Sequence, residues 1–139
     1  MNPATWLLTK ELHPSPLFQM LLVRECLADA DAAAVRGSAR LAWNRAYYAC
    51  FHAATAVFVG RNRRFTKHRG IIKAVHEDLV PEGVLSPELA VSFDGLYSQR
   101  LDADYGDFVD IPREQVANTL ETARRFVAAM ETAVQGHAR

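Results

Sequence analysis

The segment from Leu41 to Val59, with the sequence LAWNRAYYACFHAATAVFV, constrains the fold of this chain more than any other segment. Aromatic and aliphatic side chains would cover most of the circumference of a helix formed here, and such a helix is usually buried on several sides. Ser38 can cap the start of this helix, and Gly60 can end it. We therefore expect the central helix of a bundle, or a helix that also faces a second subunit.

Helical spacing of apolar residues recurs on both sides of this central segment. The further helices are predicted at about residues 15–37, 70–79, 86–101 and 112–136, with an acidic loop, DADYGDFVDIP, before the last one. The sequence shows no strand-like alternation of any length, and many of its apolar residues are alanine, which favours helices over strands. The sequence thus predicts an all-α fold, a bundle of four to five helices with short connections.

The chain length suggests a simple domain organisation. A chain of 139 residues suits one domain, which we place at residues 15–139, after an N-terminal arm of residues 1–14. No signal peptide and no membrane-spanning segment is recognisable in the sequence. We therefore expect a cytoplasmic protein that does not enter a membrane.

Composition limits the kinds of function that the chain can have. Its 16 basic and 16 acidic residues give a formal net charge of zero, which argues against binding nucleic acid by bulk charge and permits self-association. Cys26 and Cys50 lie in apolar helical patterns, typical of buried thiols in a reducing compartment. The histidines form no recognised metal spacing, and no glycine-rich phosphate loop occurs. We therefore predict no metal and no cofactor.

Arg45 and His52 are seven residues apart in the central segment, with Tyr48 between them. Seven steps of about 100° nearly complete two helical turns, so both side chains point to the same side, roughly 10 Å apart along the axis. A cation and an imidazole on an otherwise apolar helix need a reason, because burying an unpaired charge is costly. A structural explanation, in which Arg45 pairs with a carboxylate and His52 is a hydrogen-bonded core residue, is favoured by spacing alone.

The other explanation is cleavage of RNA without a metal ion. RNA carries its own nucleophile, so cleavage needs a base for the 2′-hydroxyl proton, an acid for the leaving 5′-oxygen, and positive charge on the phosphorane. His52 can exchange protons near neutral pH, and the guanidinium of Arg45 matches phosphate oxygens. Asn44 and Tyr48 would position the substrate or the pair. Two copies of the chain across a two-fold axis would double the single pair.

Two stretches of the sequence resemble the HEPN families. Residues 44–71, NRAYYACFHAATAVFVGRNRRFTKHRGI, are similar to a family run like SRAYYAMFHAA that is followed by a glycine and then a histidine-glycine step. The downstream stretch YSQRLDADYGDFVDIPREQVANTLETARRFV matches a second landmark, an arginine followed by Asp-Tyr, which falls on Arg100, Asp104 and Tyr105. The resemblance covers about residues 15–135.

The resemblance implies a compact all-α bundle that commonly forms a homodimer. Many HEPN members are ribonucleases with an Arg, four to six intervening residues and a His, a pattern that falls on Arg45 and His52. Many are toxins encoded beside a small nucleotidyltransferase that acts as antitoxin. The resemblance therefore implies a metal-independent endoribonuclease that is the toxin of such a toxin–antitoxin pair, acting on RNA such as tRNA or mRNA and leaving a 2′,3′-cyclic phosphate.

The sequence departs from the family pattern at two positions. Many active members have a polar residue just after the Arg, whereas this chain has Ala46 there and its polar neighbour Asn44 precedes the Arg. Some toxins have a Tyr two residues after the His that the partner enzyme modifies, whereas this chain has Ala54. Regulation by modification is therefore not expected at this position.

Basic residues cluster just after the central segment. We predict an RNA-binding surface there, formed by Arg61, Arg63, Arg64, Lys67, His68 and Arg69. The structural alternative is that they complement the negative end of the helix and pair with acids such as those of the acidic loop. For Arg100, Asp104 and Tyr105, a network that pins the helix to the following loop is the plainer account, with a role at the catalytic groove as the alternative.

Two other classes of function remain open at the level of sequence. The first is a non-catalytic HEPN binding module that docks a nucleotidyltransferase or another protein through Arg45 and His52. The second is a sensor with a small molecule inside the bundle, because bundle cores can hold such sites.

Overall fold

The computed structural model describes residues 15–105 and 111–137, apart from the side chains of residues 102–105 and 137. Its elements are α2 (Pro16–Arg36), α3 (Ala39–Gly60), α4 (His68–Ala74), η1 (Val75–Leu79), α5 (Pro87–Tyr105) and α6 (Arg113–His137). Since α4 runs directly into the π-helical η1, the described residues form five packed helices and contain no strand. This arrangement confirms the predicted all-α bundle. The predicted N-terminal arm, residues 1–14, lies outside the described residues.

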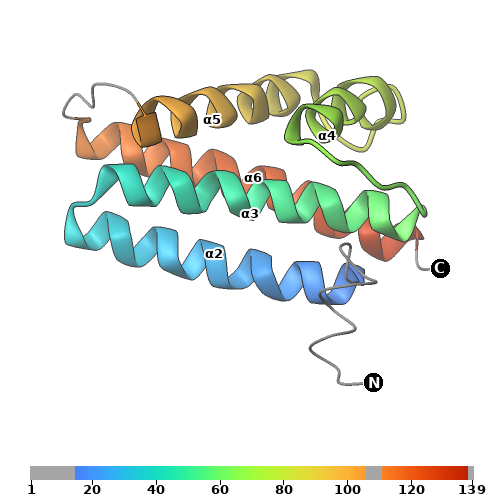
Figure 1. The fold of residues 1–139 in the computed structure, drawn as a ribbon, viewed down its shortest axis with the longest axis horizontal. Coiled ribbons are helices and arrows are strands. Elements are labelled where there is room, and N and C mark those ends of the chain that lie inside the picture. The colour runs from blue at the N-terminus through green and yellow to red at the C-terminus, as the bar shows by residue number, and fades with distance from the viewer. Residues whose placement is uncertain (1–14, 106–110, 138–139) are drawn as a thin grey trace.

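Helix α3 is the centre of the bundle, as its sequence predicted. It contacts α2, α4, α5 and α6, and Figure 1 shows the long helices lying along one another. Six of its buried residues are alanines, at positions 42, 46, 49, 53, 54 and 56. Alanine side chains let neighbouring helices approach closely while α3 stays buried on several sides.

The first two described helices begin and end for partly different reasons than expected. Ser15 caps α2, because its Oγ accepts a hydrogen bond from the backbone N–H of Phe18, and Gly37 ends α2 with a φ of 86°. Ser38 precedes α3 but makes no capping hydrogen bond through its side chain. Gly60 is the last residue of α3 rather than the stop beyond it, and Arg61 occupies the C-cap.

Helix α5 is longer than the sequence indicated. We expected it to end at about Leu101, but it continues to Tyr105, so the first four residues of the predicted acidic loop are helical. The physical reason is that no glycine or proline interrupts the chain between Leu101 and Gly106, where the helical pattern can end. The rest of that loop, residues 106–110, lies outside the described residues.

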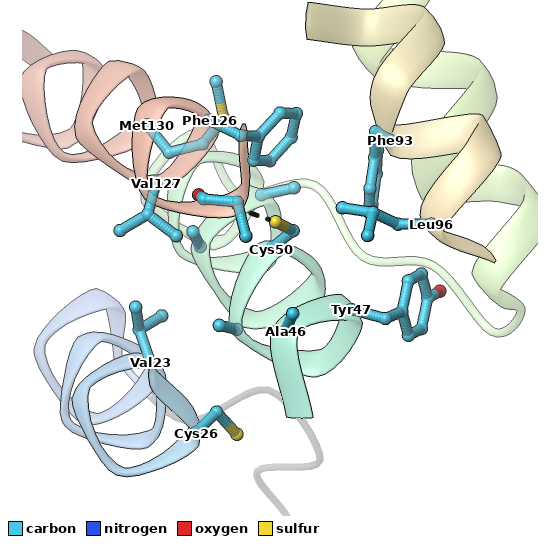
Figure 2. Packing of buried hydrophobic residues seen from close by; sticks show 14 of the residues in the cluster. Val23, Cys26, Ala46, Tyr47, Cys50, Phe93, Leu96, Phe126, Val127 and Met130 are labelled. Atoms are coloured by element: carbon cyan, nitrogen blue, oxygen red, sulfur yellow. Dashed lines mark hydrogen bonds between the residues drawn. The ribbon is translucent and has the colours of Figure 1, made fainter. Parts of the chain in front are cut away.

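The dry core lies where α3 meets α2 and α6. Cys50 is fully buried, and its Sγ lies 3.8 Å from the backbone oxygen of Ala123 on α6. Figure 2 shows Cys50 beside Phe126, Val127 and Met130 of α6. Cys26, on α2, is buried as well, so both cysteines occupy the kind of position that the sequence predicted.

Within residues 15–105 and 111–137, no helix has both the length and the apolar character needed to cross a membrane.

Candidate active site

Contacts along one side of α3 connect the predicted Arg–His pair. The guanidinium carbon of Arg45 lies 5.3 Å from the centre of the Tyr48 ring, and the Tyr48 and His52 rings have centroids 6.3 Å apart. All three side chains are partly exposed. The seven-residue spacing therefore gives one partly open strip that carries a cation, a phenol and an imidazole.

Asn44 fixes the orientation of the cation. Its Oδ1 accepts hydrogen bonds from Nε and Nη2 of Arg45, at 2.8 and 2.5 Å. This contact occupies one edge of the guanidinium. Because a guanidinium has five N–H donors, the remaining donors can still bind phosphate oxygens.

Gln19, on α2, is the partner of His52, and sequence reasoning missed it. The side-chain oxygen of Gln19 lies 2.9 Å from Nδ1 of His52, and Gln19 is only 4% exposed. An amide oxygen can only accept, so Nδ1 donates and the neutral ring keeps Nε2 unprotonated. The signal for Gln19 was its position on the otherwise apolar buried face of α2, which also carries Val23 and Cys26.

The electrostatic environment keeps His52 neutral at physiological pH. Burial lowers the pKa of His52 from its ordinary 6.5 to about 4, and the positive charge of Arg45 adds to this effect. Desolvation disfavours the charged ring, and a nearby cation does the same. His52 is therefore available as a proton acceptor through Nε2.

His68, the first residue of α4, lies against the aromatic side of α3. Its ring stacks on Phe51, with centroids 4.2 Å apart and an interplanar angle of 25°. Its Nδ1 shares a hydrogen bond of 2.8 Å with the hydroxyl of Tyr47. Burial and the nearby charge of Arg100 lower the pKa of His68. The sequence placed His68 on the basic surface, whereas the structure places it beside the Arg–His strip.

Two hollows meet at His68. The first has a volume of about 240 Å³ and is lined by Gln19, Phe51, His52, Thr55, Phe65, Thr66, Lys67, His68 and Ile71. The second has a volume of about 550 Å³ and is lined by Tyr48, Lys67, His68, Arg69, Tyr97 and Arg100. A further hollow of about 520 Å³ lies between α2 and α6, and it includes none of the candidate site residues. Tyr48, His52 and His68 therefore line the two hollows that share His68, whereas Arg45 and Asn44 line neither.

The structure divides the predicted basic surface into two parts. Arg61 forms an ion pair of 2.8 Å with Glu82, and Arg63 pairs with Asp78, so the described acids come from η1 and the turn after it rather than from the acidic loop. Glu82 and Asp78 lie close to the two arginines because α4 and η1 fold back beside the end of α3 (Figure 1). Lys67, by contrast, lines both hollows. Arg69 lines the second hollow, and Arg64 is an exposed residue with a partner of its own.

Arg100, the first residue of the second landmark, is nearly buried, at 8% exposed. Its guanidinium carbon lies 5.3 to 5.6 Å from the ring centres of Tyr47, Tyr48 and Tyr97. It therefore joins α5 to the aromatic side of α3 and also lines the second hollow. The side chains of Asp104 and Tyr105 lie outside the described residues.

At the two positions where the sequence departs from the HEPN pattern, the structure places no polar side chain in the site. Ala46 and Ala54 are both fully buried and belong to the hydrophobic core. In the part of the chain that the structure describes, no three or more His, Cys, Asp or Glu side chains are grouped so that they could hold a metal ion.

Comparison with known proteins places the chain in a family. Residues 24–133 match the HEPN domain. A UPF0332 protein of Thermotoga maritima is 30% identical over 112 residues, which cover 81% of this chain and 85% of that protein. A UPF0332 protein of Archaeoglobus fulgidus is 33% identical over 89 residues, 64% of this chain and 70% of that protein. A protein of Methanocaldococcus jannaschii named "Putative toxin MJ0605" is 34% identical over 92 residues, 66% of this chain and 67% of that protein.

Proposed function

Because the chain belongs to the HEPN family, we propose that it is a metal-independent endoribonuclease and the toxin of a toxin–antitoxin pair. The observation that carries this proposal is the hydrogen bond of 2.9 Å between Gln19 and Nδ1 of His52, which leaves Nε2 as a base on the same strip as the guanidinium of Arg45. What favours a base over a core residue is that His52 is only partly buried and lines an open hollow. The name of the Methanocaldococcus jannaschii relative supports the toxin part of the proposal.

The proposed reaction uses the 2′-hydroxyl of RNA as its nucleophile. Nε2 of His52 takes the hydroxyl proton while the 2′-oxygen forms a bond to phosphorus. Arg45, oriented by Asn44, stabilises the negative charge that grows on the phosphorane oxygens. The bond from phosphorus to the 5′-oxygen breaks, and this oxygen leaves with a proton. The products are a 2′,3′-cyclic phosphate and a 5′-hydroxyl.

The proposed active form is a homodimer. The Arg45–Tyr48–His52 strip is partly exposed, so a second copy can approach it across a two-fold axis. Such an approach would bring two Arg–His pairs to one groove and would exclude water from the phosphate. Light scattering of the purified protein should therefore give the mass of two chains.

The proposed partner is a nucleotidyltransferase antitoxin. Position 54 holds a buried alanine, so the partner cannot modify a tyrosine there and would act by covering the site. Co-purification of the chain with the product of a neighbouring nucleotidyltransferase gene, with loss of RNA cleavage in the complex, is the expected outcome.

Cleavage of total RNA and tRNA in EDTA tests the proposed activity. The wild-type protein should cleave and leave 2′,3′-cyclic phosphate ends, whereas Arg45→Ala and His52→Ala should each lose roughly 10²- to 10⁴-fold in rate. His76→Ala is the matched control, because His76 contacts Asp94 at hydrogen-bond distance and lines neither of the two hollows. Equal cleavage by wild type and the His52 variant would contradict the proposal.

A binding module without catalysis is the second candidate. It is favoured by apolar side chains exposed near the start of α2, where Leu17, Phe18 and Leu21 are 74%, 37% and 54% exposed. Large exposed apolar groups on one segment often mark a protein interface. This candidate predicts a stable protein complex that persists in Arg45 and His52 variants, and no cleavage by the wild type.

A further inference from the structure

The proposed reaction needs two proton transfers, but the Arg45–His52 pair supplies one titratable group. An arginine keeps its charge and does not exchange protons at neutral pH. The leaving 5′-oxygen therefore needs an acid, either the second His52 of the proposed dimer or another residue of the same chain. Among the residues that line the hollow of His52, only His68 has an ordinary pKa close to neutrality.

His68 is held in place as firmly as His52. Its Nδ1 is engaged by the hydroxyl of Tyr47, a fully buried residue whose ring also stacks near Phe93 at 5.9 Å. Burial raises the pKa of Tyr47, so the phenol keeps its proton. The ring of His68 is fixed by its stack on Phe51. These contacts leave Nε2 as the nitrogen available to a substrate.

The position of His68 suits a phosphodiester that meets both imidazoles. His68 and His52 line the same hollow of about 240 Å³, together with Lys67. His68 also lines the second hollow, with Arg69 at its edge. A phosphate in the first hollow would therefore have both imidazoles in its lining, and the RNA chain could continue past the basic side chains of the second.

We propose that His52 and His68 of one chain form the acid–base pair of the ribonuclease, with His52 as base and His68 as acid. This inference rests on the proposed function. As the 2′-oxygen bonds to phosphorus and gives its proton to His52, the electron pair of the breaking bond moves to the 5′-oxygen. That oxygen takes the proton from Nε2 of protonated His68, and exchange with water then restores both rings.

Substrate is needed to charge His68. The groups that face His68 are Tyr47, Tyr48 and His52 of α3, Tyr97 and Arg100 of α5, and its neighbour Lys67. None of these is a carboxylate, and burial, followed by the charge of Arg100, holds the pKa of His68 down. A bound phosphate supplies the missing negative charge and raises the pKa of an adjacent imidazole. The acid therefore forms when RNA binds.

RNA with a bridging sulfur in place of the 5′-oxygen tests this role, because a thiolate leaves without an acid. We expect His68→Ala and His68→Gln to cleave ordinary RNA roughly 10²- to 10⁴-fold more slowly than wild type and to cleave the sulfur-containing RNA at close to the wild-type rate. His52→Ala should be slow on both substrates, because the base is still required. The glutamine variant keeps a side chain that can bond to Tyr47, and circular dichroism checks that both variants fold.

The outcomes separate this inference from the proposed function. Equal losses on both substrates would mean that His68 only supports the structure, and no loss on either would remove it from the reaction. Either result overturns the inference and leaves the ribonuclease in place. No cleavage of either RNA by the wild type would overturn the proposed function and this inference together.

Discussion

The two sides of α3 differ in what fills them. Toward α6 and the apolar residues of α2, alanines and Cys50 of α3 pack against Val23, Val127 and Met130 (Figure 2). On the other side, Arg45 and His52 lie along an open strip, with partners from α2 and α4 close by. Helix α3 thus carries a closely packed face toward α6 and the apolar residues of α2, called the dry face below. It also carries a hollowed face, which holds the Arg45–Tyr48–His52 strip.

This difference shows how a small bundle can fix the position of reactive side chains on one of its helices. The dry face fixes the position of α3, because protein interiors pack with few voids and resist displacement. The hollowed face can then leave room for a substrate without loss of geometry. Changes on the dry face should therefore act on stability, and changes on the hollowed face should act on activity and on its pH dependence.

The largest expected effect is the loss of stability when a large side chain that packs at the dry face is truncated. Phe126 is 1% exposed and packs on Phe93, with ring centroids 4.7 Å apart. Phe126→Ala should lower the free energy of unfolding by about 3–5 kcal/mol, through lost burial and the cavity left behind. Urea unfolding measures this change. If the variant kept its stability but lost RNA cleavage at low temperature, the separation between the two faces would be wrong.

Acid should destabilise the protein through the hollowed face. The folded-state pKa of His52, about 4, lies below its ordinary 6.5, so the unfolded chain binds more protons between these values. The contribution of His52 to the free energy of unfolding should be fully present above pH 6.5 and should be lost as pH approaches 4. The loss should be roughly 1–2 kcal/mol, because partial exposure of the ring to water reduces the effect.

The matched variant for this effect is His52→Ala. It should show a smaller loss between pH 6.5 and pH 4, with the remainder due partly to His68, whose pKa is lowered as well. Thermal unfolding at a series of pH values measures both proteins. Parallel curves for wild type and variant would show that His52 does not titrate differently in the folded state.

The sequence predicted the dry face better than the hollowed one. Helical periodicity and the glycine at position 37 sufficed for the extent of α2 and for the burial of α3. The shared side of Arg45 and His52 followed from their spacing, which is a local property. The partners of the two histidines did not follow, because Gln19 is 33 residues from His52, and His68 is 21 residues from Tyr47. Only the packing of α2 and α4 on α3 brings them together.

A charge at position 19 should move the pH dependence of cleavage. In Gln19→Glu, a carboxylate would accept the hydrogen bond from Nδ1 of His52 and favour the protonated ring, raising its pKa by roughly 1–2 units. The acidic limb of the rate profile should move to higher pH by the same amount. Gln19→Leu is the control, which should lower the rate without this upward shift. An unchanged profile in both variants would mean that Gln19 does not position the base.

The smallest expected effect concerns the half of the basic surface that is already paired. Arg61→Ala removes an ion pair with Glu82, a residue 45% exposed at its side chain, and should cost about 0.2–1 kcal/mol of stability. Because Arg61 lines neither hollow beside His68, RNA affinity should not change. Lys67→Ala is the matched comparison and should weaken binding of a non-cleavable 2′-O-methyl RNA, with a smaller salt dependence. Equal weakening by the two variants would show that RNA contacts the whole basic surface, and that the paired arginines exchange their carboxylates for phosphates when RNA binds.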